Sequence, residues 1–561
     1  PRRAAPRARS LWDAASAARP RGREMASEFL GLVRSAHCAW PSRGIEVDMQ
    51  LLPLTAHPVL SPNSAVLSGA SQADFLLAAL GTKGVQGSLN CTRPPAAPSL
   101  APRARRIVVA QYWNWHSAAT AGGLDGARGF QRAEAHYAAL RTLMHPSDGG
   151  RAPVVLLMHA SEWATDATLK EVHMVLSRFA VDIARVVFVH FNHGAMRDTY
   201  LLRRSGNAPL WAPLQDWAER QGLRSRAAAA PLRQAYWQVM LWILASRKPA
   251  AGRRRQQGAA HVCRPTARTA RASAARASRA RPPALEGLRP SPFLLLGGNP
   301  RYFRGLVMLD LARRGLLPSL ARWSGSRFGF CDDAQPLRWV GQPGVSKAFF
   351  HGAAGRPPPF SLAEQRGLLG DVALVRSLCA NLPKVLDVSP DIKSDSKVLD
   401  SDDAIWRDLR FALTFESDMV SGDAEAELLF VTEKTIKPIQ NGVPFIVLGS
   451  AGTLATLRSL GFRTFAPAIN ESYDQQLDGT ARLQAALAEA ERLSALPDSA
   501  WRELSRDDGP LAEAVRHNQR LVLCGGFRRT LGAHAVQLIA RALELRSRPK
   551  PGASCKGRAA A

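Results

Sequence analysis

One segment of the chain, 411–465, alternates apolar runs with polar turns in an order that few folds can accommodate. The apolar run at 411–415 predicts a short buried strand, and the run at 443–448 predicts a second one. Between them, the triplet at 432–434 opens a helical stretch. This order of strand, helix and strand is typical of a parallel α/β sheet, in which ligands bind beyond the carboxyl ends of the strands. We expect Glu416 and the triplet to lie at that edge.

The charged residues around this predicted edge suit an anionic ligand that also carries hydroxyl groups. A helix N-terminus presents N–H groups and partial positive charge, which favour phosphate. Lys434 in the first turn adds a positive charge, while Glu416 and Glu433 can accept hydrogen bonds from sugar or ribose hydroxyls. The alternative is purely local, with Thr432 as an N-cap, Glu433 complementing the helix dipole and Lys434 exposed to solvent.

The same segment resembles the donor-binding signature of the α-1,3-fucosyltransferases and their relatives. The shared pattern is F-x-L-x-F-E-S, a variable loop, F-V-T-E-K and then G-V-P-x-x-x-x-G. The amino-acid sequence of this segment also resembles that of uncharacterised fucosyltransferase-like proteins of large viruses and marine microbes. A looser sequence resemblance extends over 290–520. The family's Glu-Asn-Ser element is altered, because Ser417 and Asp418 follow Glu416 directly. The residues that match the pattern are Phe415, Glu416, Ser417, Thr432, Glu433, Lys434, Gly442, Val443, Pro444 and Gly449.

A second family-like element lies upstream, where an apolar strand at 293–296 runs into the Gly-Gly-Asn turn at 297–299 and a helix at 306–316. Arg301 and Arg304 are three residues apart, so they share one face of a helical turn. Arginine binds phosphate through a planar fork of donors. The resemblance implies that this turn faces the donor diphosphate. An ordinary strand–turn–helix junction with solvated arginines is the alternative.

The N-terminal half predicts a second α/β domain. Near-continuous apolar strands begin at Arg106, Pro153 and Arg185, and a helix at 169–179 separates the last two. Such strands are typical of a parallel sheet buried on both faces. The predicted fold class is therefore α/β. The resemblance implies the GT-B arrangement, with two Rossmann-like domains facing a central cleft, and the composition adds disordered basic insertions.

Inverting sugar transfer needs a general base that takes the proton of the acceptor hydroxyl. The resemblance implies a carboxylate of the N-terminal domain in this role. Glu162, at the end of a predicted strand, is the candidate, with His159, His193 and Asp198 as alternatives. The simpler interpretation of Glu162 is a strand-end residue that bonds to the backbone.

The net charge of +28 and the pI of about 10.9 first suggest a nucleic-acid partner. Much of that charge lies in two Ala/Arg/Pro-rich stretches whose composition predicts disorder. Residues 247–284 hold eleven Lys or Arg and no acid, and residues 1–23 hold seven Arg and one Asp. No zinc-finger spacing, aromatic-basic RNA motif or helix-turn-helix accompanies them, so a nucleic-acid partner is not expected.

Domain boundaries follow from these patterns. We expect a poorly defined extension at 1–104, an acceptor-side α/β domain at 105–246, a disordered linker or insertion at 247–290, a nucleotide-sugar-binding α/β domain at 291–475, C-terminal helices at 476–545 and a disordered tail at 546–561.

Other motifs give weaker signals. Asp400-Ser401-Asp402 resembles an Asp-x-Asp metal motif, but it follows an acidic loop rather than a strand, so no metal cofactor is expected. The seven cysteines lack Cys-x-x-Cys spacing. Asn90-Cys-Thr and Asn470-Glu-Ser are glycosylation sequons, a pattern that often arises by chance. No apolar run reaches the roughly 18 residues that a transmembrane helix needs.

The sequence thus predicts an inverting glycosyltransferase that moves a sugar, with fucose from GDP-fucose as the leading candidate, to a glycan or other hydroxyl acceptor. Its partners would be the nucleotide sugar, which is a co-substrate rather than a cofactor, and a glycan or glycoconjugate. A different sugar nucleotide, an inactive carbohydrate-binding scaffold on the same fold and a basic RNA-associated protein are the alternatives. The resemblance also implies the secretory pathway.

Overall fold

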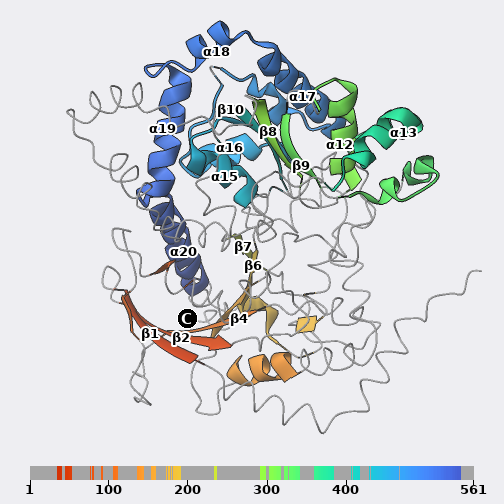
Figure 1. Cartoon of the computed structure of the whole chain (residues 1–561). Helices are drawn as coiled ribbons and strands as arrows, with labels where there is room; N and C mark the ends of the chain where they lie inside the picture. Colours follow the sequence, from red (N-terminus) through yellow and green to blue (C-terminus); the bar gives the residue numbers. More distant parts are fainter. Residues whose placement is uncertain are drawn as a thin grey trace, which may run out of the picture. The chain divides into compact units, whose positions relative to one another are not determined.

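The computed structural model describes residues 34–40, 45–52, 90–92, 105–111, 135–144, 153–158, 181–190, 233–236, 291–297, 302–317, 321–325, 327–341, 359–383, 409–416, 431–466 and 468–544, with a few single positions between them. The chain divides into two compact units (Figure 1). The first comprises Pro1–Phe191, Ala195–Val239 and Leu531–Ala561, and the second comprises Asn192–Gly194 and Met240–Thr530.

The first unit contains a seven-stranded sheet in the order β3-β1-β2-β4-β5-β6-β7. Strand β1 runs antiparallel to β2 and β3, whereas β2, β4, β5, β6 and β7 are parallel. The strands are β1 (Arg34–Trp40), β2 (Ile45–Leu52), β3 (Asn90–Thr92), β4 (Arg105–Gln111), β5 (Val154–Met158), β6 (Val186–His190) and β7 (Arg233–Tyr236). The predicted parallel strands beginning near 106, 153 and 185 are thereby confirmed.

The core of this unit forms between the sheet and a helical segment at 135–144. Val108, Val155 and Phe188 on three neighbouring strands are fully buried, as is Tyr137 on the helical segment. The Tyr137 ring stacks on Phe179 with centroids 5.4 Å apart. A short 3-10 turn, η3 (Ile183–Arg185), leads into β6. Apolar burial on this scale is the main favourable contribution to folding, so the central strands anchor the unit.

Three strands lie before residue 105, where the sequence predicted no element. Strand β2 pairs in parallel with β4, with Met49 opposite Ile107, and β1 and β3 extend the sheet beyond β2. Part of the stretch 1–104 therefore belongs to the sheet of the first unit.

The second unit contains a four-stranded, fully parallel sheet in the order β11-β10-β8-β9. Its strands are β8 (Ser291–Gly297), β9 (Ala321–Gly325), β10 (Leu409–Phe415) and β11 (Phe445–Leu448). Phe293 and Phe411 are register partners whose rings stack 5.3 Å apart. The prediction of strands at 293–296, 411–415 and 443–448 is confirmed. Both units are α/β by themselves, which confirms the coarse fold class.

Helices accompany this sheet (Figure 1). They are α12 (Tyr302–Arg313), α13 (Leu362–Gly370), α14 (Val372–Ala380), α15 (Glu433–Asn441), α16 (Thr453–Ser459), α17 (Gly479–Ala495), α18 (Asp498–Leu504) and α19 (Pro510–Leu523), with 3-10 turns η6 (Gly329–Cys331), η7 (Pro336–Trp339) and η12 (Glu471–Gln475). Helix α20 (Gly526–Glu544) begins in the second unit and ends in the first. Helix α15 packs on β10 and β11, and α17 packs on β8 and β11.

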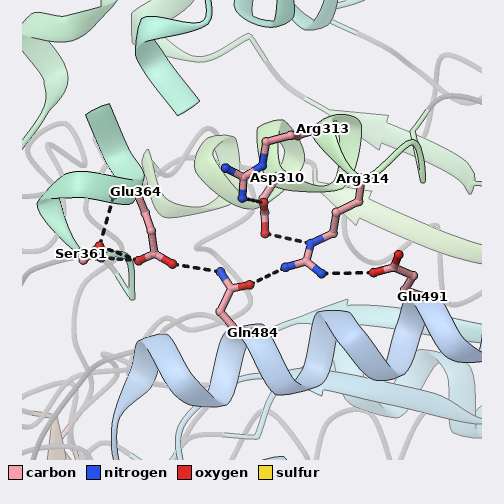
Figure 2. Close-up of polar contacts among 7 residues, drawn as sticks. All are labelled: Asp310, Arg313, Arg314, Ser361, Glu364, Gln484 and Glu491. Carbon is pink, nitrogen blue, oxygen red and sulfur yellow. Dashed lines mark hydrogen bonds and ion pairs between the residues drawn. The ribbon is translucent and has the colours of Figure 1, made fainter. Parts of the chain in front are cut away.

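A polar network around the buried Asp310 fixes the C-terminal end of α12 (Figure 2). Asp310 is fully buried and forms ion pairs with Arg313 and Arg314. The Nε of Arg314 lies 3.2 Å from the Oδ2 of Asp310. Arg314 also contacts Gln484 and Glu491 on α17. Gln484 in turn donates to Glu364 Oε1 of α13 at 3.2 Å. Because buried charges are tolerated only when they are paired, this network holds α12 in one position against both helices.

A disulfide joins Cys331 of η6 to Cys379 of α14. The two residues are 48 positions apart in the sequence, and no local spacing pattern predicts that they pair. The bond closes a loop that contains η7 and α13. It therefore adds a covalent constraint to this side of the second unit.

Candidate functional site

Glu416 connects the two halves of the motif recognised in the sequence. It follows β10 directly and is only 1% exposed. Its Oε1 accepts the backbone N–H of Thr432 at 3.0 Å, and its Oε2 accepts the Thr432 hydroxyl at 2.6 Å. The Thr435 hydroxyl also donates to Oε1. The end of β10 and the first turn of α15 are thus one hydrogen-bonded unit.

Thr432 is the N-cap of α15, the role that the local alternative gave it. Its backbone is extended, and its hydroxyl accepts the N–H of Lys434 at 3.1 Å while donating to Glu416. At the other end of the helix, Gly442 adopts a left-handed conformation with φ of 71° and closes the helix before β11. The predicted helix limits, 432–434 and Asn441-Gly442, are confirmed.

Arg304 joins the upstream element to the same place. Its Nη2 donates to the backbone oxygen of Glu416 at 3.1 Å, although the two residues are 112 positions apart. Its guanidinium lies 5.7 Å from the centroid of the Phe415 ring, a cation–π distance. The side chain is 1% exposed. In the described structure Arg304 therefore supports the site from inside, through contacts with the end of β10.

Lys434 places a second positive charge, besides that of the buried Arg304, beside Glu416 and Thr432. Its side chain is partly exposed, and its Nζ lies 3.4 Å from the Thr432 hydroxyl. Burial raises the pKa of Glu416 above its ordinary value, and the Lys434 charge, followed by hydrogen bonds from Thr432 and Thr435, offsets part of that rise. A buried carboxyl beside a lysine at a helix N-terminus is the type of cluster that marks functional sites.

The neighbouring turn after β11 is already occupied by the protein's own groups. Asp474 accepts the N–H groups of Leu454 and Ala455 at 3.0 and 3.2 Å, so its carboxylate caps α16. Arg482, 1% exposed, donates from Nε to the Gly449 oxygen at 2.9 Å. These contacts fill the first turn of α16. The first turn of α15 is likewise bonded to Thr432 and Glu416, but it also carries the partly exposed Lys434, so it is the candidate for an anionic ligand.

Several predicted site residues lie outside the described part of the chain. They are Glu162, His159, His193, Asp198, Arg301 and the Asp400-Ser401-Asp402 motif, and the side chain of Glu433 joins them although its backbone begins α15. Of the predicted donor-binding residues, the structure brings together Arg304, Glu416, Thr432 and Lys434.

Sequence reasoning missed Thr435, and it noted Arg482 only for its family-like spacing after the motif, without predicting its contact with Gly449. Thr435 lies three positions after Thr432, so helical spacing alone places both hydroxyls on the face toward Glu416. Arg482 gave no such signal, because an arginine inside an amphipathic helix usually faces solvent.

Among the described residues, no group of three or more His, Cys, Asp or Glu side chains is arranged to hold a metal ion. Within the same residues, no helix has both the length and the apolar character needed to span a bilayer.

No family model matches this chain, and no curated protein or solved structure matches it either. The functional argument therefore depends on the chain's own residues.

Proposed function

We propose that this chain is an inverting glycosyltransferase that uses a nucleoside-diphosphate sugar, with GDP-fucose as the leading candidate, and transfers the sugar to a hydroxyl of a glycan or glycoconjugate. The observation that supports the proposal is the convergence of Arg304, Glu416 and Thr432. These residues come from the two segments that resemble the fucosyltransferase donor site, and hydrogen bonds link them at the carboxyl end of β10.

The donor diphosphate would lie at the N-terminus of α15. Lys434 and the N-terminal end of the helix dipole supply positive charge there. That charge would stabilise the nucleoside diphosphate as it leaves with the bonding electrons of the C1–O bond. Arg301 would add a second cation, whereas the buried Arg304 would keep the end of β10 in place. Glu433 would accept hydrogen bonds from ribose or sugar hydroxyls.

In this proposal, Glu162 is the general base that acts on the acceptor. Its carboxylate would take the proton of the acceptor hydroxyl while the acceptor oxygen attacks C1 from the face opposite the diphosphate. The configuration at C1 inverts as a result. A GT-B arrangement of the two α/β units, with Glu162 and Lys434 across a cleft, is part of this proposal.

A second candidate is a nucleotide-sugar-binding scaffold without transferase activity. It is favoured by the internal use of Glu416 and Arg304, whose polar groups bond to Thr432, Thr435 and the backbone. In that case the site would keep its structure and its ligand but would lack turnover.

Turnover separates the two candidates. The full chain, given GDP-fucose, GDP-mannose or a UDP-sugar with a panel of glycan acceptors, should release nucleoside diphosphate with one donor. Glu162→Gln should abolish release and keep donor binding. Glu503→Gln, which changes an exposed carboxylate on α18 that pairs with Arg506, is the matched control and should leave the rate unchanged. Donor binding without release in the wild type would favour the scaffold, and no binding of any donor would contradict both candidates.

A further inference from the structure

The sequon Asn470-Glu471-Ser472 lies on the surface of the second unit, with both the acceptor asparagine and the hydroxyl-bearing serine exposed. Asn470 and Ser472 are exposed, while Tyr473 and Asp474 immediately after them are buried. We propose that Asn470 is a site for an N-linked glycan. This proposal is independent of the proposed transferase activity.

The segment that carries the sequon is held firmly on its inner side. The Asn470 N–H donates to Glu489 Oε1 at 2.8 Å, and the Tyr473 hydroxyl accepts the N–H of Val447 at 3.2 Å. Glu471 accepts the N–H of Phe465 and pairs with Arg458. Because the backbone and the inward side chains supply these contacts, a large group on the outward Asn470 side chain would not compete with them.

The side-chain contact that Asn470 makes also survives glycosylation. As N-cap of η12, its Oδ1 accepts the N–H of Ser472 at 3.1 Å. Transfer forms a bond between Nδ2 and the anomeric carbon of a lipid-diphosphate-linked oligosaccharide and breaks the bond between that carbon and the diphosphate oxygen. One Nδ2 proton is released, and the lipid diphosphate leaves. The product is still an amide, so Oδ1 keeps its acceptor role.

The disulfide provides an independent observation that points to the same compartment. N-linked transfer occurs in the oxidising secretory lumen, where structural disulfides also form and persist. Cys331 and Cys379 are bonded within the same unit as Asn470.

The test uses the full chain expressed behind a secretory leader in eukaryotic cells, with peptide mapping after digestion by peptide N-glycosidase. The wild type should show Asn470 converted to Asp by the enzyme, together with a Cys331–Cys379 linked peptide. Ser472→Ala should lose the modification at 470, because the acceptor motif needs the hydroxyl. Ser472→Thr, the matched control, should keep it. Mapping resolves Asn470 from the other sequon at Asn90.

The Ser472 variants test modification rather than folding, since Ser472 is exposed and both variants keep the backbone N–H that it donates to Asn470 Oδ1. An unmodified Asn470 peptide in secreted protein that carries the disulfide would overturn the proposal. Equal modification of residue 470 in Ser472→Ala would overturn it too, because the sequon would then play no part.

Discussion

Glu416 and Thr432 are joined by two hydrogen bonds, one from the Thr432 N–H at 3.0 Å and one from its hydroxyl at 2.6 Å. The pair connects the end of β10 to the first turn of α15. Both residues are about 1% exposed, so water does not compete for either bond. This pair explains physically why a carboxylate and a threonine 16 positions apart belong to one motif.

The first prediction concerns the contribution of the Thr432 hydroxyl to stability. Thr432→Val keeps the shape but removes a donor to Glu416 and the acceptor that caps Lys434. The buried carboxylate loses a partner, so the free energy of unfolding should fall by about 1–3 kcal/mol. Thr432→Ser restores the hydroxyl and should recover most of the loss. Urea unfolding of the three proteins checks this. Equal free energies of unfolding for Thr432→Val and the wild type would mean that the hydroxyl does not contribute to stability.

The buried carboxyl of Glu416 predicts a pH dependence. Burial raises its pKa above the ordinary 4.5, so between the two values the folded state binds more protons than the unfolded state. The stability that Glu416 contributes is then complete below pH 4.5 and is lost as the pH rises through the folded-state value. The wild type minus Glu416→Gln difference in unfolding free energy should therefore decrease with rising pH. A difference that grows with pH would show that the Lys434 charge and the threonine hydrogen bonds outweigh burial.

The disulfide predicts a loss of stability on removal. Cys331 and Cys379 close a loop of 48 residues, for which chain entropy gives about 4 kcal/mol. Cys331→Ser/Cys379→Ser should therefore unfold at lower urea concentration by a corresponding amount. The double variant is preferable to a reducing agent, because it leaves other cysteines untouched. A midpoint equal to that of the wild type would contradict a structural role for the bond.

Two glycines should respond in opposite directions to alanine. Gly442 has φ of 71°, and a Cβ there would lie 2.6 Å from Gln519 Nε2, so Gly442→Ala should cost about 1–2 kcal/mol. Gly367 lies inside α13 with no atom within 4 Å of an added Cβ, so Gly367→Ala should stabilise by about 0.5–1 kcal/mol. Thermal unfolding should show shifts of opposite sign. Shifts of the same sign would contradict the assigned backbone conformations.

Strands β8, β10 and β11 and helix α15 of the second unit were predictable from sequence because their signals are local, whereas β9, α13 and α14 were not predicted. Glycine at 442, the capping threonine at 432 and the short apolar runs each specify one element, and parallel pairing then brings the strand ends together. The contacts of Arg304 and Arg482 were not predictable in that way. Their partners are backbone oxygens at 416 and 449, and only the folded chain determines those distances.

In the sheet of the first unit, β2 carries a clear strand pattern in its sequence, whereas β3 carries none. Strand β2 alternates apolar Ile45, Val47, Met49 and Leu51 with polar residues, which is the pattern of a half-buried strand, and the described side chains at 47, 49 and 51 are indeed buried. The alternation alone is therefore enough to predict β2. Strand β3, at three residues, is too short for periodicity to identify.

Binding of a nucleoside diphosphate tests the central claim most directly. Calorimetric titration of the full chain with GDP, UDP and their sugars should show one nucleotide bound, and Lys434→Ala should weaken that binding by about tenfold or more, since an ion pair with phosphate at this site is worth at least about 1.4 kcal/mol. Arg502→Ala, a cation exposed on α18, should leave the affinity unchanged. Undiminished affinity in Lys434→Ala, or no binding of any nucleotide by the folded wild type, would contradict the account.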